Sequence, residues 1–490
     1  MLSTYLRFLL LACLLVSCSF STLVAQAHPG WALDPYAGIS AAFLQPAATA
    51  AIPYNWDLHL GGAALHLQNN SFFIRNASLT GLARDLAGGT GIGLDETELA
   101  FRVNGRNYAY DFTTHDHPVF VHTSAEITGP AFSVQVGNYT RIGGFSRIRT
   151  IASTRRTDPV FNYYNLIGAD GSAPFQLDPL YAAAVGWAEF GGHLSRAFSV
   201  TDDAELRLGL NVKFLLPVEG ASFYNPDGSS ALREDSLSRT FIDGDTDIAL
   251  TNGDGSGPAG RGLGADLGVQ YAWGSIRGVS GYRYTVGASV LDVGNIVFNQ
   301  RSRAFNFNND GLVRLEGPLY DSTLTAGGID AALEQLSRDF YDGNATAARR
   351  GSVFRVGLPT MVSLQLSARP TAHVFVSAAY TGDLPLRKQQ LSRGQQLVVS
   401  GHYSRWWYGA GLSAGMYDWR EFNIGMQLRA GPLYLGTNRL FGTLFGTGEL
   451  AAADFYFGLR IHEFNKKKGR KGKSRNGGGR KGKTVKCYDF

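Results

Sequence analysis

One short segment has the letters of a phosphate-binding loop. Residues 477–484 read Gly-Gly-Gly-Arg-Lys-Gly-Lys-Thr and satisfy that pattern position by position. The loop works only between a strand and a helix, where backbone N–H groups converge on the phosphate. Here the letters lie in a tract of Gly, Lys and Arg, so we interpret them as a chance match in a segment of low complexity.

A second segment places carboxylates on alternating positions, as a calcium loop does. Asp243, Asp245 and Asp247 supply the first three acidic side chains. An EF-hand loop also needs Gly at its sixth position and Glu at its twelfth, where this chain has Ile248 and Asp254. We therefore interpret the segment as an acidic turn.

Three histidines have the side chains for a metal site but not its geometry. On an extended chain His115 and His117 share one face, whereas His122 points to the other. Pro118 follows directly, which is typical of the entry to a strand. The sequence predicts no metal site here.

Acyl-transfer chemistry would need a Ser held by a His that is itself oriented by an acid or an amide. His59, His66 and His193 lie in expected strands, and Ser195 is close to His193 in sequence. No local pattern singles out one pair. We predict no catalytic, cofactor-binding or metal residues, and a protein that is not an enzyme. A lipid-acting barrel enzyme is the least favoured alternative.

The elements that carry these residues are strands, because apolar and polar residues alternate along them. Between Glu205 and Phe214, every second residue is apolar and the residues between are polar or Gly. The period of two fits a strand with one apolar face. The pattern recurs at 422–429, 282–290, 362–367 and 98–104. Runs of nine or ten residues have the length of a strand that crosses a bilayer at a tilt.

The two ends of the chain differ from its body. Residues 1–27 form an expected signal peptide, with an apolar run from Phe8 to Val24 and a small-x-small cleavage pattern ending at Ala27. Lipidation of Cys18 is the alternative. Residues 465–490 carry 11 Lys and Arg residues against one acid, so the body is mildly acidic and nucleic-acid binding is not predicted. We expect this tail to be a basic, disordered periplasmic segment that touches anionic lipid, an envelope protein, or no partner.

The resulting fold class is all-β: a transmembrane antiparallel barrel. We expect about 14 strands, and any number from 12 to 16 fits the pattern. The expected barrel covers residues 54–464, and residues 28–53 precede it. Two polar inserts, 224–264 and 298–351, are interpreted as surface loops. A short amphipathic helix is expected in the second, since Ile329, Leu333, Leu336 and Phe340 have helical spacing.

Several segments resemble an uncharacterised outer-membrane family of Bacteroidota. They are residues 40–48 with Gln45 before Pro46, the first strand at 54–60, the Asn-Asn-Ser-Phe step at 69–72, and an aromatic residue followed by spaced arginines at 143–149. More remotely, that family is similar to barrels of the fatty-acid-transporter type. This resemblance implies that residues 28–53 fold into the lumen as a plug.

Two functional hypotheses follow. The first is a passive outer-membrane transporter or channel for a small molecule, a hydrophobic one in keeping with the resemblance, gated by the N-terminal segment or the long loops. The second is a non-conducting scaffold or adaptor barrel in a cell-envelope complex.

Overall fold

The computed structural model describes residues 29–75, 77–87, 93–95, 100–103, 106–114, 117–155, 157–159, 175–233, 239–252, 257–276, 279–440 and 449–463. The expected signal peptide, Cys18, His115 and the basic tail lie outside the described residues. The phosphate-loop letters at 477–484 lie outside them as well.

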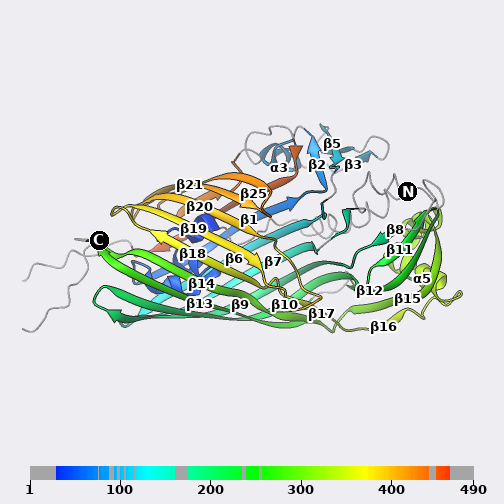
Figure 1. Ribbon diagram of the computed structural model, residues 1–490, viewed down its shortest axis with the longest axis horizontal. Helices are drawn as coiled ribbons and strands as arrows, with labels where there is room; N and C mark the ends of the chain where they lie inside the picture. The colour runs from blue at the N-terminus through cyan, green and yellow to red at the C-terminus, as the bar shows by residue number, and fades with distance from the viewer. Residues whose placement is uncertain are drawn as a thin grey trace, which may run out of the picture.

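Fourteen antiparallel strands form a closed barrel, because the first strand pairs with both the second and the last (Figure 1). β1 pairs with β6 on one side and with β25 on the other, where Asp57 lies opposite His462. Between them each strand pairs with the next around the ring. The predicted fold class and strand number are confirmed. The strands are β1 (Trp56–Asn69), β6 (Val121–Val136), β7 (Thr140–Arg155), β9 (Leu180–Thr201), β10 (Ala204–Asn225), β13 (Gly260–Ile276), β14 (Val279–Phe298), β18 (Met361–Ala368), β19 (Val374–Asp383), β20 (Gln396–Ser404), β21 (Tyr408–Tyr417), β22 (Glu421–Ala430), β23 (Leu433–Thr437) and β25 (Ala452–His462).

The two ends of the barrel differ in the length of their connections. At the end where β1 starts and β25 finishes, tight turns such as Asp202–Asp203 and Gly431–Pro432 join the strands. The long connections lie at the opposite end, at the right of Figure 1. We call these the short-turn end and the long-loop end. In bacterial barrels the short turns face the periplasm.

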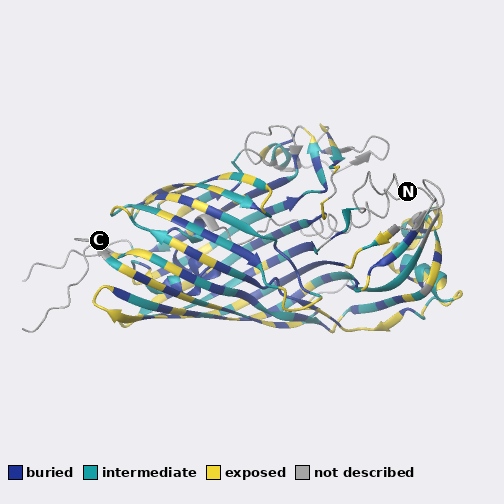
Figure 2. Cartoon of the chain, viewed as in Figure 1, coloured by how far each residue is buried: buried dark blue, intermediate teal, exposed yellow. Residues whose placement is uncertain are grey.

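Alternation along each strand separates an apolar outer face from the lumen. On β9, Phe190, Leu194 and Phe198 are 43–52% exposed, whereas Glu189 and His193 are buried. Figure 2 shows this alternation of exposed and buried residues along the barrel strands. Apolar side chains outside and polar ones inside are the arrangement of a barrel surrounded by lipid. Among the described residues, no helix has both the length and the apolar character that a membrane-crossing helix requires.

The prediction that the two polar inserts are surface loops is wrong for most of their length. Asp, Gly and Ser have low strand propensity, but strands of the barrel continue beyond the ring and act as templates for pairing. β12 pairs with the end of β10, and β15 pairs with β12. The inserts form β11 (Ser229–Arg233), β12 (Arg239–Thr251), β15 (Ser302–Glu316), α5 (Gly317–Phe340) and β16 (Arg349–Gly351). Outside the inserts, β8 (Phe175–Leu177) pairs with β11, and β17 (Phe354–Gly357) pairs with β14.

The predicted amphipathic helix is present as α5. Its residues Leu333, Leu336 and Phe340 pack against Phe305 and Phe307 of β15. The helix therefore covers the strands that extend past the barrel, at the right of Figure 1.

A second, small sheet lies beside the long-loop end. The alternation near residues 98–104 predicts a barrel strand, and this prediction is wrong: Phe101 and Val103 belong to β4 of this sheet, whose strands are too short to cross a bilayer. Its order is β24–β2–β5–β4–β3. Its elements are β2 (Phe72–Arg75), α3 (Leu79–Ala87), β3 (Gly93–Asp95), β4 (Ala100–Val103), β5 (Arg106–Phe112) and β24 (Glu449–Leu450).

The N-terminal segment, residues 29–54, has only short helical turns. They are α2 (Pro29–Ala32), η1 (Gly38–Phe43) and η2 (Pro46–Ala51). Pro46 at the start of η2 has the φ angle that a helix needs, and the Gln45 side chain accepts a hydrogen bond from the N–H of Ala47. Most of this segment is buried.

Candidate functional site in the barrel lumen

The N-terminal segment lies inside the barrel, because its hydrogen bonds reach inward-facing groups all around the ring. We call it the plug. Its partners lie on β1, β9, β10, β14, β18 and β20, strands that surround the lumen. These contacts are Ile39 N to Asp57 Oδ2, Thr49 Oγ1 to His193 Nε2, Asn211 Nδ2 to Ala42 O, Ser289 Oγ to Leu44 O, Gln365 Nε2 to Leu44 O, and Ser404 Oγ to Asp34 Oδ2, all between 2.6 and 3.1 Å.

Thr49 connects the plug to a chain of buried polar groups. His193 Nδ1 lies 2.7 Å from Asn211 Oδ1, and both hydrogens of Asn211 Nδ2 go to Ala42 O and Asp266 Oδ2. Nδ1 must therefore carry the proton, and Nε2 of the neutral ring accepts the Thr49 hydroxyl hydrogen at 2.6 Å. Ser195 Oγ lies 2.7 Å from the Thr49 oxygen, so the two hydroxyl groups are hydrogen-bonded to each other. The order hydroxyl, imidazole, amide is that of a hydrolase triad, but here these buried groups join the plug to the wall.

We expect Thr49→Val to loosen the plug. The change leaves the His193 ring nitrogen and the Ser195 hydroxyl buried without their partner, which costs about 1–3 kcal/mol. Limited proteolysis of the folded protein should cut within residues 29–54 faster than in the parent chain. Thr150→Val, on the outer face of β7, is the matched control and should cut at the parental rate. Equal rates for both variants would contradict this role of Thr49.

The plug contacts the wall most closely where the wall has no side chains. A Cβ atom added at Gly209 would collide with the backbone of Pro46 and Ala47, and one at Gly268 would collide with the Gln45 side chain. Gln45 Nε2 also donates to the carbonyl oxygens of Val269 and Ala288, at 3.1 and 3.2 Å. Glycine allows this approach because its backbone has no Cβ.

Beyond the plug, the wall carries an ionic cluster of eight buried side chains. It has four cations and four anions, so it is neutral as a whole. Seven members point inward from six neighbouring strands, β6 to β14. The cluster consists of Glu126, Arg147, Arg149, Glu189, Lys213, Asp266, Asp292 and Arg393.

Asp292 is the centre of this cluster. Its carboxylate accepts two hydrogen bonds from Arg149, both at 3.0 Å, and contacts Lys213 Nζ and Arg393 Nη2 at 2.5 Å each. Its φ of 54° lies in the left-handed region, at a β-bulge opposite Asp266. Bulges turn side chains out of the regular pleat and are frequent beside functional sites. The backbone N–H of Asp292 donates to Asp266 Oδ1 at 2.7 Å.

Arg393 is the one member of the cluster that does not come from the barrel wall. It belongs to the connection 384–395, which turns into the lumen from the long-loop end. Gln390 of this connection forms a bridge with Gly357, and Leu391 N donates to Gly357 O at 3.1 Å. We call residues 384–395 the cap; residues 354–358 belong to the wall, since β17 pairs with β14.

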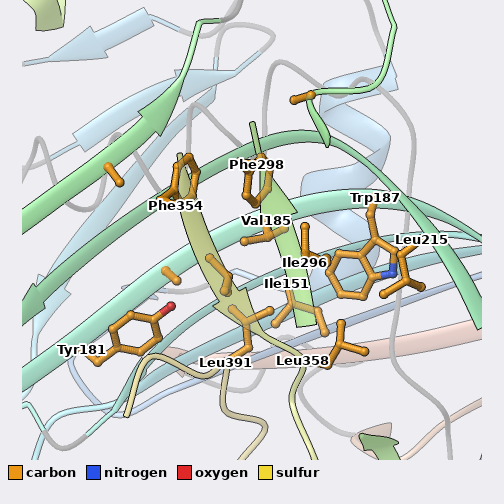
Figure 3. Packing of buried hydrophobic residues seen from close by; sticks show 14 residues of the cluster. Ile151, Tyr181, Val185, Trp187, Leu215, Ile296, Phe298, Phe354, Leu358 and Leu391 are labelled. Atoms are coloured by element: carbon orange, nitrogen blue, oxygen red, sulfur yellow. The ribbon is translucent and has the colours of Figure 1, made fainter. Parts of the chain in front are cut away.

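On the long-loop side of the ionic cluster the lumen is apolar. Ile151, Val185, Trp187 and Leu358 of the wall pack there against Leu391 of the cap (Figure 3). The order along β9 gives the sequence of layers: apolar at 181–187, ionic at Glu189, and plug contacts at 193–195. The ionic cluster thus lies between plug and cap, and it touches both: Arg147 lies 4.0 Å from the Phe43 ring, and Arg393 comes from the cap.

The residues considered for chemistry occupy structural positions. His59 and His66 lie on β1 and His122 on β6; His122 Nδ1 lies 2.8 Å from the Tyr417 hydroxyl. Asp245 and Asp247 lie within strand β12, where both accept hydrogen bonds from Asn306, so the expected acidic turn is a strand. In the described part of the chain, no three His, Cys, Asp or Glu side chains gather as metal ligands would.

One further pattern was overlooked in the sequence. Residues 411–415 read Gly-Leu-Ser-Ala-Gly, the letters of a hydrolase nucleophile elbow. They lie in the middle of β21, paired on both sides, whereas the elbow is a strand-to-helix turn. The pattern therefore has no elbow geometry here.

The ionic cluster was not predicted, although one signal for it was visible. The segment 143–149, which carries the family resemblance, contains Phe145, Arg147 and Arg149. Phe145 packs against Phe43 of the plug, and the two arginines enter the cluster.

The closed ring, its apolar outer face and its occupied lumen define a transmembrane-type β-barrel that carries its own N-terminal plug. Within that class, the chain belongs to a family of unknown function, DUF5723, whose profile matches residues 46–438. A search of curated proteins finds no match.

Several solved structures have remote similarity to this chain. A FadL homologue of Pseudomonas aeruginosa has 14% identity, covers 89% of this chain and 96% of its own, and has a TM-score of 0.39. A mutant of the monoaromatic hydrocarbon channel TodX has 9% identity, coverages of 87% and 94%, and a TM-score of 0.40. The toluene transporter TbuX of Ralstonia pickettii has 11% identity, coverages of 87% and 95%, and a TM-score of 0.35.

Proposed function

We propose that this protein is a gated, passive transporter of the outer membrane for a small, mostly apolar molecule. The observation that carries the proposal is that segments outside the barrel strands fill the lumen from both ends. The plug enters from the short-turn end, and the cap enters from the long-loop end. The plug is held by contacts that involve side chains, and the cap by side-chain contacts and backbone hydrogen bonds to Gly357, so each can leave without unpairing two strands of the ring.

The substrate class follows from the lining between cap and wall. Ile151, Val185, Trp187 and Leu391 offer apolar surface to a molecule that enters from the long-loop end. Burial of apolar surface stabilises such a molecule there without charge or metal. Location in the outer membrane is supported by the outer apolar face and by the closed ring, which leaves no sheet edge unpaired.

Deletion of residues 28–53 tests the transport proposal. Loss of the plug should leave a heat-modifiable barrel in the outer-membrane fraction, and should raise both ion conductance in planar bilayers and solute flux into proteoliposomes. The parent chain is the control for insertion, since its unboiled band should migrate at the same position. A deletion variant that inserts normally and shows parental flux would contradict gating by the plug.

The same experiment distinguishes the scaffold alternative. A densely paired interior, with Asp292 contacting three cations, also suits a barrel that only supports partners. A stoichiometric partner that co-purifies, together with no flux from either the parent or the deletion variant, would favour the scaffold. Recovery of the parent chain as a soluble periplasmic protein without heat-modifiability would overturn both functions.

A further inference from the structure

The Tyr181 hydroxyl lies in the apolar part of the lumen. The Tyr181 side chain on β9 is 4% exposed, and its buried hydroxyl has no hydrogen-bond partner among the residues that the structure describes. In Figure 3 this hydroxyl is directed toward the other side chains of the apolar cluster. A buried, unpaired hydroxyl is costly, so native structures rarely keep one without a purpose.

The surroundings of Tyr181 divide into a fixed part and a movable part. Val185 and Ile296 stand on barrel strands, whose backbones are paired on both sides. Leu391 belongs to the cap, which contacts the wall through side chains and through backbone hydrogen bonds at Gly357. Phe354 and Leu358 are part of the wall, because β17 pairs with β14 and Leu358 N donates to Gly294 O. Separating the cap from the wall would expose an apolar cleft with the Tyr181 hydroxyl in it.

We propose that the interface between wall and cap, around Tyr181, is the binding site for a small apolar molecule that carries one hydroxyl or carbonyl oxygen. This inference rests on the proposed function and narrows its substrate class. The hydrocarbon part of the molecule replaces the contacts of Leu391 with the wall. Its oxygen forms with Tyr181 the hydrogen bond that the closed protein lacks. Trp187 belongs to the same cluster, so we expect its fluorescence to change on binding.

A pair of probes that differ by one hydroxyl group tests the site. Naphthalene and 1-naphthol have the same ring system, and their binding to the full-length barrel in detergent can be followed by calorimetry, with tryptophan quenching as a second readout. The parent protein should bind 1-naphthol roughly 3- to 10-fold more tightly than naphthalene, the range expected for one net hydrogen bond. Tyr181→Phe should abolish this preference and leave naphthalene binding unchanged.

Tyr224→Phe is the matched control. The Tyr224 ring packs edge-on against Tyr181, with 6.0 Å between ring centroids, but the residue is only partly buried. This variant should keep the parental preference for 1-naphthol. Tyr181→Phe also removes a buried unpaired hydroxyl, so the variant should fold at least as stably as the parent. An equal preference for 1-naphthol in parent and Tyr181→Phe would overturn the site.

Solute flux into proteoliposomes separates this inference from the proposed function. Plug-dependent flux, together with a preference for 1-naphthol that does not depend on Tyr181, would reject the site and still support the transporter proposal. No flux in the parent or in the plug deletion would reject the transporter, and the premise of this site with it. A Tyr181-dependent preference in both binding and flux is the result that we expect.

Discussion

Asp292→Asn is expected to lower the free energy of unfolding by about 3–5 kcal/mol, the cost of leaving buried charges without their partner. The carboxylate contacts Arg149, Lys213 and Arg393 at once, and the variant cluster keeps four cations against three anions. Water must then enter to solvate the excess charge. The temperature at which the heat-modifiable band disappears should fall, and ion conductance should rise.

One control variant and one compensating variant test whether the net charge of the cluster matters. Asp202→Asn, in the exposed turn after β9, should leave both the transition temperature and the conductance at parental values. Adding Arg393→Gln to Asp292→Asn restores a neutral cluster, so the double variant should recover part of the lost stability. A coupling free energy of about 0.5–3 kcal/mol is typical of residues in one ion-pair network. A double variant that loses the sum of the two single effects would show that net charge is not what matters.

Gly209→Leu is expected to displace the plug while the barrel stays closed. The new side chain must occupy the position of the Pro46 and Ala47 backbone, which lies against Gly209. Overpacking of this kind costs about 1–3 kcal/mol, which corresponds to a roughly 5- to 150-fold larger population of the displaced state. Proteolysis within residues 29–54 and solute flux should both increase, as in the plug deletion.

Gly192→Leu is the control for this substitution. Gly192 lies on the neighbouring strand β9, is exposed on the outer face, and a Cβ atom there meets nothing within 4 Å. The variant adds the same side chain without reaching the lumen and should keep parental flux. If Gly209→Leu inserts normally and its plug is cut no faster than in Gly192→Leu, the close contact does not hold the plug.

The barrel was predictable because its signal is local and repeated. Alternation such as that of residues 205–214 depends on neighbours in sequence, and a strand with lipid on one face must show it. The helix α5 was equally visible from the spacing of Leu333, Leu336 and Phe340. The strands of the polar inserts were missed, because β12 and β15 are rich in Asp, Asn and Gly and form only where other strands extend beside them.

The ionic cluster was not predictable in the same way. Its eight residues come from six strands and the cap, and each is an unremarkable polar residue on an inward face. Charge pairing across such distances in sequence leaves no periodic signal. Asp292 has a visible signal in the sequence, because the apolar residues Val290, Leu291 and Val293 around it interrupt the alternation at the bulge. The plug position came only from a family resemblance, and the structure supplied the contacts that hold it.

The closure of the ring through β1 and β25 sets the order of events in assembly. Asp57 cannot meet His462 until the last strand has been synthesised and carried to the membrane, so the sheet has two open edges until the end. Closing a loop of this length is slow, and open edges promote aggregation during that time. The pairing of β1 with β25 is therefore the step that removes both open edges of the sheet at once.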